Sequence, residues 1–187
     1  NIASITNALK NLKYDFIISS SKINILNSDL LILPGVGTFG EAINNLKKKN
    51  IDKIIYEKDK LHKPILGICL GMQLLAKIGY ENEKNYGLNL INGQVEKIDK
   101  NSHHIGWNDI KIKKGFLKQF DKKLFYFNHG YFFKTSKKYS IADVYFKNYF
   151  PAIIKKGNIC GIQFHPERSH SQGLEILNKI IENLTND

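Results

Sequence analysis

The chain has few cysteines and no long apolar run, and each shortage excludes a class of protein. Its 187 residues include two cysteines, Cys69 and Cys160, too few for a disulfide framework and typical of a reducing compartment. No run approaches the roughly 20 apolar residues that a membrane-spanning helix needs, and no basic-then-apolar leader opens the chain. We therefore expect a soluble, cytoplasmic protein with no membrane partner.

Arginine is also scarce, which changes the meaning of the net charge of +11. Of the 28 basic residues 27 are lysine, and only Arg168 offers the planar fork that favours phosphate and base recognition. The 20 asparagines and 27 isoleucines share AT-rich codons with lysine, so genome composition accounts for the excess. We expect no nucleic-acid partner, although a basic face for an acidic protein or a phosphorylated metabolite stays open. The cysteines and histidines lack zinc-ligand spacing, and we expect no metal or cofactor.

Helical and extended patterns alternate along a chain of single-domain length, residues 1–187. Apolar residues at helical spacing predict helices over residues 2–12, 39–46, 51–55, 70–78 and 174–184. Short apolar runs predict strands over residues 15–19, 30–33, 64–68 and 159–164, with short antiparallel strands between 87 and 150. This alternation predicts an α/β fold with a mostly parallel central sheet, flanking helices and a small antiparallel insert. Because such domains normally begin with a central strand, we expect an N-terminal strand to be missing from this sequence.

A glycine-flanked cysteine stands where a predicted strand turns into a helix. Residues 67–71, Gly-Ile-Cys-Leu-Gly, match the Gly-x-nucleophile-x-Gly elbow with cysteine as the nucleophile. The glycines permit a sharp turn that exposes the sulfur of Cys69, and the following helix start favours the thiolate. The backbone N–H of Leu70 then faces a developing oxyanion. The alternative is that Cys69 is a small buried hydrophobe, as we expect for Cys160, which lies inside a strand.

A base for this nucleophile follows the last predicted strand. In the extended run Gln-Phe-His-Pro-Glu at 163–167, His165 and Glu167 point to the same side. Glu167 can therefore accept from one imidazole nitrogen while the other faces Cys69, which predicts a Cys-His-Glu triad rather than an ordinary loop histidine. The loop Pro-Gly-Val-Gly at 34–37 also follows a strand and can bring a second oxyanion donor to the same edge. It lacks the lysine of a phosphate loop.

Together these segments resemble the triad (class I) glutamine amidotransferases, and within them the glutaminase branch of imidazole glycerol phosphate synthases from histidine biosynthesis. The resemblance spans nearly the whole chain and implies a flavodoxin-like fold. It rests on Leu-Pro-Gly-Val-Gly-Thr-Phe at 33–39, Gly-Ile-Cys-Leu-Gly-Met-Gln-Leu-Leu at 67–75, Ile-Gly-Trp-Asn at 105–108 and Gly-Ile-Gln-Phe-His-Pro-Glu-Arg-Ser at 161–169.

The resemblance implies a glutaminase that works through a glutamyl thioester. Cys69 attacks the side-chain amide of L-glutamine, His165 protonates the leaving ammonia, and Glu167 holds His165. Matching positions place the oxyanion donors at Leu70, Val36 and Gly37 and the glutamine-binding residues at Gln73, Glu81, Gly35 and Ser169, with His170 bordering the pocket or interface. A solvated helix-end carboxylate is the alternative for Glu81.

The resemblance also implies a partner. In this branch ammonia crosses to a cyclase subunit, a (β/α)₈ barrel, which makes imidazole glycerol phosphate and AICAR in a heterodimer. Interface residues by motif match are Trp107, Asn108, His129 and Tyr131. A buried core tryptophan is the alternative for Trp107.

Three positions depart from the pattern of this branch. Residue 103 is histidine instead of proline, and Asn128 and Gly130 lie in an Asn-His-Gly-Tyr run where Val-His-Ser-Tyr is expected. A second hypothesis is therefore a paralogous subunit that supplies ammonia to another biosynthetic enzyme, such as one for surface-sugar amidation. A third is a non-catalytic scaffold subunit, against which the intact triad residues speak.

Overall fold

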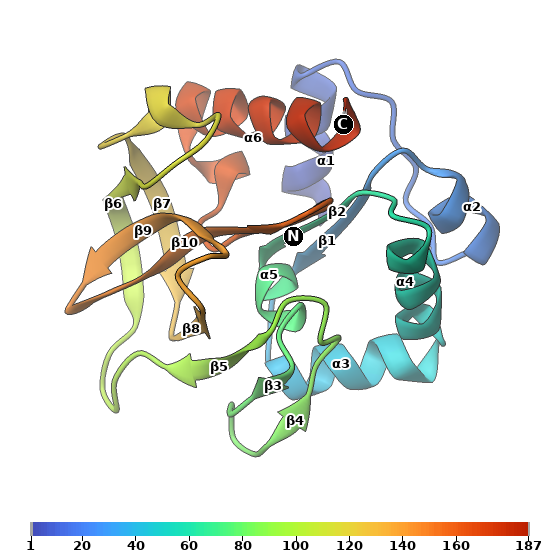
Figure 1. The fold of residues 1–187 in the computed structure, drawn as a ribbon, viewed down its shortest axis with the longest axis horizontal. Coiled ribbons are helices and arrows are strands. Elements are labelled where there is room, and N and C mark those ends of the chain that lie inside the picture. Colours follow the sequence, from blue (N-terminus) through green and yellow to red (C-terminus); the bar gives the residue numbers. More distant parts are fainter. Residues whose placement is uncertain (1, 187) are drawn as a thin grey trace.

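A seven-stranded sheet with helices on both faces forms the centre of the computed structural model, which describes residues 2–186 (Figure 1). Its strand order is β1-β2-β11-β10-β9-β6-β7. The parallel strands are β1 (Leu31–Gly35), β2 (Ile65–Cys69) and β11 (Ile159–Ile162). The antiparallel strands are β10 (Asn148–Lys156), β9 (Ser140–Phe146), β6 (His104–Ile112) and β7 (Leu124–His129).

This architecture confirms the α/β class, and it differs from the expected sheet in one respect. Four antiparallel strands between residues 104 and 156, β6, β7, β9 and β10, continue the main sheet, whereas the strand at Tyr131–Thr135 joins a separate small sheet. Within the described part of the main sheet, β1 with β2 and β2 with β11 are the parallel pairs, so this sheet is mixed instead of mostly parallel. One cause is the tight turn at Lys147 between β9 and β10, which permits only antiparallel pairing of these two strands.

Helices cover both faces of the sheet, and successive side chains along a strand point alternately into the two resulting cores. Helices α1 (Ile2–Asn11) and α6 (His170–Thr185) cover one face, and α3 (Phe39–Lys48) and α4 (Ile51–Lys60) cover the other (Figure 1). On β2, Leu66 and Ile68 pack into the core cluster of α1 and α6, while Ile65 packs into that of α3 and α4. Among the described residues no helix is both long and apolar enough to cross a bilayer.

A smaller sheet lies below the main one in Figure 1, beside α5 (Leu70–Leu74) and α3. Its strands, in spatial order, are β4 (Asn85–Tyr86), β3 (Ile78–Gly79), β5 (Gly93–Lys97) and β8 (Tyr131–Thr135). The predicted helix over 70–78 is therefore too long. Backbone N–H groups of Leu88 and Leu90 bind the carbonyls of Leu74 and Leu75, which ends the helix after about one turn.

The predicted strand over residues 15–19 is also wrong. This segment has no regular structure, and Ile17 and Ile18 are 64% and 67% exposed. A short helix, α2 (Lys22–Asn27), follows it and was not expected. A fully apolar run such as residues 30–33 is typical of a strand that is buried on both faces. Strand β1 instead forms one edge of the described sheet, and most of its residues are only half-buried.

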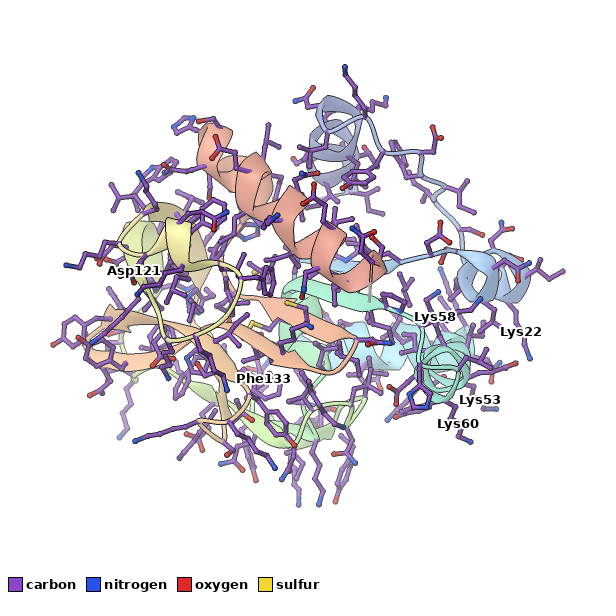
Figure 2. All side chains as sticks on the ribbon, turned by 45° about the horizontal axis from the view of Figure 1, so that its top comes forward. Lys22, Lys53, Lys58, Lys60, Asp121 and Phe133 are labelled. Carbon is purple, nitrogen blue, oxygen red and sulfur yellow. The ribbon has the colours of Figure 1, made fainter. Side chains whose placement is uncertain are left out.

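One buried lysine fastens α2 to α4. The ammonium of Lys58 donates to the carbonyls of Ile25 and Ser28, at 2.9 and 2.7 Å, and to the Ser28 hydroxyl. Figure 2 shows Lys58 pointing toward α2, whereas Lys53 and Lys60 point outward from α4. Lys58 therefore closes the end of α2 with three hydrogen bonds, which compensates for burying its charge.

Candidate active site

The glycine-flanked turn at the end of β2 has the strained geometry of a nucleophile elbow. Cys69 adopts φ +54° and ψ −111°, a conformation that L-residues rarely occupy. A Cβ on Gly71 would lie 1.7 Å from the carbonyl oxygen of Leu33, and one on Gly67 would lie 2.5 Å from the carbonyl oxygen of Gly71. Both glycines are therefore required by contact between β1, β2 and α5, and the turn presents Cys69 to the cavity described below.

The other cysteine is a core residue, as expected. Cys160 lies on β11, is fully buried, and has no elbow around it. Burial raises the pKa of its thiol to about 12, so it stays protonated and inert at neutral pH.

His165 and Glu167 come together next to Cys69. The Nδ1 atom of His165 lies 2.9 Å from Oε1 of Glu167, and both side chains are buried. Burial alone would lower the pKa of His165, but its hydrogen bonds and charge interactions with Cys69 and Glu167 raise that pKa to about 9. An imidazolium at neutral pH stabilises negative charge on the adjacent sulfur. This arrangement can therefore supply a nucleophile and a proton donor together.

Ser169 is hydrogen-bonded to the backbone of His165. Its hydroxyl donates to the His165 carbonyl at 2.7 Å and accepts from the backbone N–H of Tyr126 at 2.9 Å. Ser169 is fully buried and does not line the cavity, so the structure does not bring it to the glutamine pocket where the motif match placed it. Its position fixes the backbone from which the imidazole projects.

Cys69 and His165 open into a cavity of about 790 Å³. Most of the predicted oxyanion and substrate residues line it, together with several basic residues. The predicted lining residues are Val36, Gly37, Leu70, Gln73 and Glu81, and the basic ones are Lys97, Lys100, His103 and Arg168. A concave site with convergent polar groups beside a histidine of perturbed pKa is typical of an active site.

The loop after β1 lies against the elbow. Gly35 pairs with Cys69 in the parallel register, and a Cβ on Gly35 would contact the Cβ of Leu70 at 3.0 Å. Gly35 therefore packs beneath the cavity and is absent from its lining. Gly37 has φ +101° and Val36 is 62% exposed, so this part of the loop is free of packing that would fix its peptide planes.

Gln73 and Glu81 are both anchored by hydrogen bonds to the protein. The Gln73 side-chain nitrogen donates to the Tyr131 carbonyl at 2.9 Å and to Oε1 of Gln163 at 3.2 Å. The Glu81 carboxylate accepts from the backbone N–H of Phe39 at 2.7 Å, at the first turn of α3. This contact excludes a freely solvated carboxylate at position 81.

The four predicted interface residues lie in different environments. Trp107 is 42% exposed and stacks on His170, with ring centroids 4.8 Å apart, which excludes a core tryptophan. Asn108 lies beside it on β6. His129, in contrast, is only 4% exposed, because alternation along β7 turns it inward; the interface prediction for it is wrong. Tyr131 is half-buried and lines the cavity.

The three departures from the family pattern are neighbours in the lining of the cavity. The His103 ring lies 3.0 Å from Oδ1 of Asn128, and a Cβ on Gly130 would lie 3.2 Å from the same ring. The carbonyl of Asn128 is 4.0 Å from the Cys69 sulfur. Sequence reasoning treated these positions separately, whereas the pairing of β6 with β7 places His103 beside the end of β7.

Sequence reasoning missed His104 altogether. This residue is 2% exposed and its Nδ1 atom lies 3.1 Å from Nε2 of His129. The available signal was alternation, since a strand beginning at His104 puts it on the buried side together with Ile110 and Ile112.

A flavodoxin-like α/β fold in which a hydrogen-bonded His–Glu pair lies next to a cysteine on a nucleophile elbow defines a glutamine amidotransferase of the triad class. The family "Glutamine amidotransferase class-I" matches residues 1–184, and the chain belongs to this family. It is 39% identical to "Imidazole glycerol phosphate synthase subunit HisH" of Carboxydothermus hydrogenoformans, with 98% of this chain and 95% of that protein covered.

One further relative agrees with this assignment, and one solved structure is similar in fold. The protein of the same name from Listeria monocytogenes serotype 4a is 41% identical over 183 residues, with 95% of this chain and 88% of that protein covered. The solved structure titled "Crystal structure of glutamine amidotransferase" is similar in fold, with a TM-score of 0.79 at 17% identity, covering 100% of this chain and 95% of that one.

Proposed function

We propose that this chain is the glutaminase subunit of an imidazole glycerol phosphate synthase, which hydrolyses L-glutamine to glutamate and ammonia in histidine biosynthesis. The observation that carries the proposal is the contact between the strained Cys69 elbow and the buried His165–Glu167 pair at the floor of an open cavity. Similarity at about 40% identity to HisH proteins over nearly the whole chain supports it.

In the first half-reaction the Cys69 thiolate attacks the side-chain carbonyl carbon of glutamine. The oxyanion of the tetrahedral intermediate accepts a hydrogen bond from the backbone N–H of Leu70 and a second one from an N–H of the Val36–Gly37 loop, which lies against the elbow. The C–N bond then breaks, and the imidazolium of His165 gives its proton to the leaving nitrogen. The products are ammonia and a glutamyl thioester on Cys69.

In the second half-reaction water cleaves the thioester. His165, now neutral, accepts a proton from the attacking water, and the C–S bond breaks to release glutamate and restore the thiolate. Glu167 keeps Nδ1 of His165 protonated throughout, so that Nε2 faces the reacting atoms.

The amino-acid end of glutamine lies against Gln73 and Glu81 in this proposal. The carboxylate of Glu81, fixed by its hydrogen bond to α3, attracts the α-ammonium group. Gly35 and Ser169 act indirectly, by packing under the elbow and under His165.

The ammonia passes to a cyclase partner, a (β/α)₈ barrel, in a cytoplasmic heterodimer with this single-domain chain. Ile105 and Trp107 are 62% and 42% exposed and lie two residues apart on β6, so they share one face of the strand. Such apolar groups on a strand surface favour a protein partner over nucleic acid or membrane. We place Trp107 and Asn108 at this interface and His129 and Tyr131 behind it.

A second candidate is a paralogue that passes ammonia to a different acceptor enzyme. The joined His103–Asn128–Gly130 cluster in the lining of the cavity favours it, because a changed exit fits a changed partner. Glutamate release, measured alone and with the cyclase subunit plus its phosphoribulosyl ligand, separates the two. Strong stimulation that is lost in Cys69→Ala supports the first candidate. Cys69-dependent hydrolysis without stimulation supports the second, and no hydrolysis under any condition overturns both.

A further inference from the structure

Two buried histidines form a chain of hydrogen bonds between strand β6 and the cavity. The Asn108 amide nitrogen lies 3.2 Å from Nε2 of His104, and Nδ1 of His104 lies 3.1 Å from Nε2 of His129. Nδ1 of His129 in turn lies 2.7 Å from the Tyr131 carbonyl. That same carbonyl accepts from the Gln73 side chain at 2.9 Å. None of these links takes part in the reaction proposed above.

The chemistry of the acceptors fixes the direction of every bond. A carbonyl only accepts, so His129 carries its proton on Nδ1 and, when neutral, presents a bare Nε2. His104 must then donate from Nδ1, which leaves its own Nε2 to accept from the amide of Asn108. The second hydrogen of that amide goes to the Tyr145 carbonyl at 2.9 Å. Each donor therefore has one acceptor.

The surroundings keep both rings neutral and immobile. The His104 ring is stacked between Phe127 and Phe146, with centroid distances of 4.6 and 4.4 Å, and Phe150 meets both imidazoles edge-on. Burial lowers the pKa of His104 to about 4 and that of His129 to about 3. The chain consequently keeps one direction throughout the neutral pH range.

We infer that His104 and His129 are positioning residues, whose hydrogen bonds hold the Gln73 side chain in the glutamine pocket. The Tyr131 carbonyl connects the histidines to Gln73, because it accepts one hydrogen bond from His129 and one from Gln73. If the first bond is lost, the carbonyl is free to turn, and Gln73 loses the shorter of its two hydrogen bonds and keeps only the one to Gln163. This inference rests on the proposed function, since it assigns Gln73 to substrate binding.

The kinetic test compares variants of His129 in the complex with the cyclase subunit. His129→Leu introduces an apolar side chain of similar size and removes both hydrogen bonds of the imidazole. We expect it to raise KM for glutamine about five- to tenfold, as for the loss of one buried hydrogen bond, while kcat changes less than about threefold. His129→Asn places an amide nitrogen near the former Nδ1 and should restore KM to within about threefold of wild type.

The matched control is Phe150→Leu, which disturbs the same aromatic cluster without removing a hydrogen bond. It should lower the melting temperature and leave KM unchanged. If Phe150→Leu raises KM as much as His129→Leu does, the role of His129 is merely structural and the inference is overturned. An unchanged KM in His129→Leu, or a loss confined to kcat, overturns it as well.

A second measurement does not depend on catalysis. The side-chain NH₂ of Gln73, observed by ¹⁵N NMR, should exchange slowly with water in wild type, His129→Asn and Phe150→Leu, and quickly in His129→Leu. Equal protection in all four proteins overturns the inference. If wild type shows no Cys69-dependent glutaminase activity while these exchange rates differ as expected, the proposed function fails and the positioning of Gln73 stands.

Discussion

Replacing Glu167 by glutamine tests how much of the chemistry depends on the buried His165–Glu167 pair. The two side chains are joined at 2.9 Å, and together with Cys69 the carboxylate raises the pKa of His165 from 6.5 to about 9 against the opposing effect of burial. The neutral amide keeps the shape of the carboxylate but loses its charge. A hydrogen bond to a charged group contributes about 1.5–3 kcal/mol, so we expect Glu167→Gln to lower kcat roughly 10- to 150-fold.

The same substitution should move the pH profile in a defined direction. The active form holds His165 protonated, so kcat/KM falls on the alkaline side as pH rises through the pKa of about 9. Without the carboxylate that pKa is lower, and the alkaline limb shifts to lower pH. Glutamate release between pH 6 and 10 measures both effects, with the exposed Glu175→Gln as a matched control. A kcat within threefold of wild type together with an unmoved limb would refute the reasoning.

Other predictions follow from single contacts. Gly71→Ala puts a methyl group 1.7 Å from a strand carbonyl and should cost about 3 kcal/mol of unfolding free energy or prevent folding, measured by urea titration. Gly130→Ala should change kcat/KM in wild type and change it much less in a His103→Ala background. The reason is that the added methyl group lies 3.2 Å from the His103 imidazole. Equal effects of Gly130→Ala in the two backgrounds would contradict this contact. The pKa of His165 is raised on folding, so its contribution to stability is complete below pH 6.5 and is lost as pH rises through about 9; denaturation midpoints of wild type and His165→Gln should converge over that range. Trp107→Ala should weaken cyclase binding about tenfold by calorimetry while basal glutamate release stays unchanged.

The elbow could be predicted from sequence because its constraint is local. The two glycines around Cys69 are required by close backbone contacts, of Gly67 with the start of α5 and of Gly71 with β1, and the sharp turn found at that point is the one expected. The His-x-Glu spacing likewise needs only an extended backbone to bring His165 and Glu167 together.

The errors arise where a distant segment decides the local structure. The apolar run at residues 15–19 resembles a strand, but no described strand pairs with it. The helix after Cys69 ends early because the loop at 88–91 takes its carbonyls. His129 looked like an interface residue by motif, yet its burial depends on alternation along β7 and on its contact with His104 from β6. Such long-range pairings are not visible in the spacing of residues along one chain.

Mass spectrometry of the chain quenched during turnover of L-glutamine tests the central claim most directly. The account predicts one added glutamyl group, attached to Cys69, absent from the fully buried Cys160 and absent altogether in Cys69→Ala, which releases no glutamate. Release of glutamate by Cys69→Ala at the wild-type rate, or a glutamyl group carried elsewhere on the chain, would contradict it.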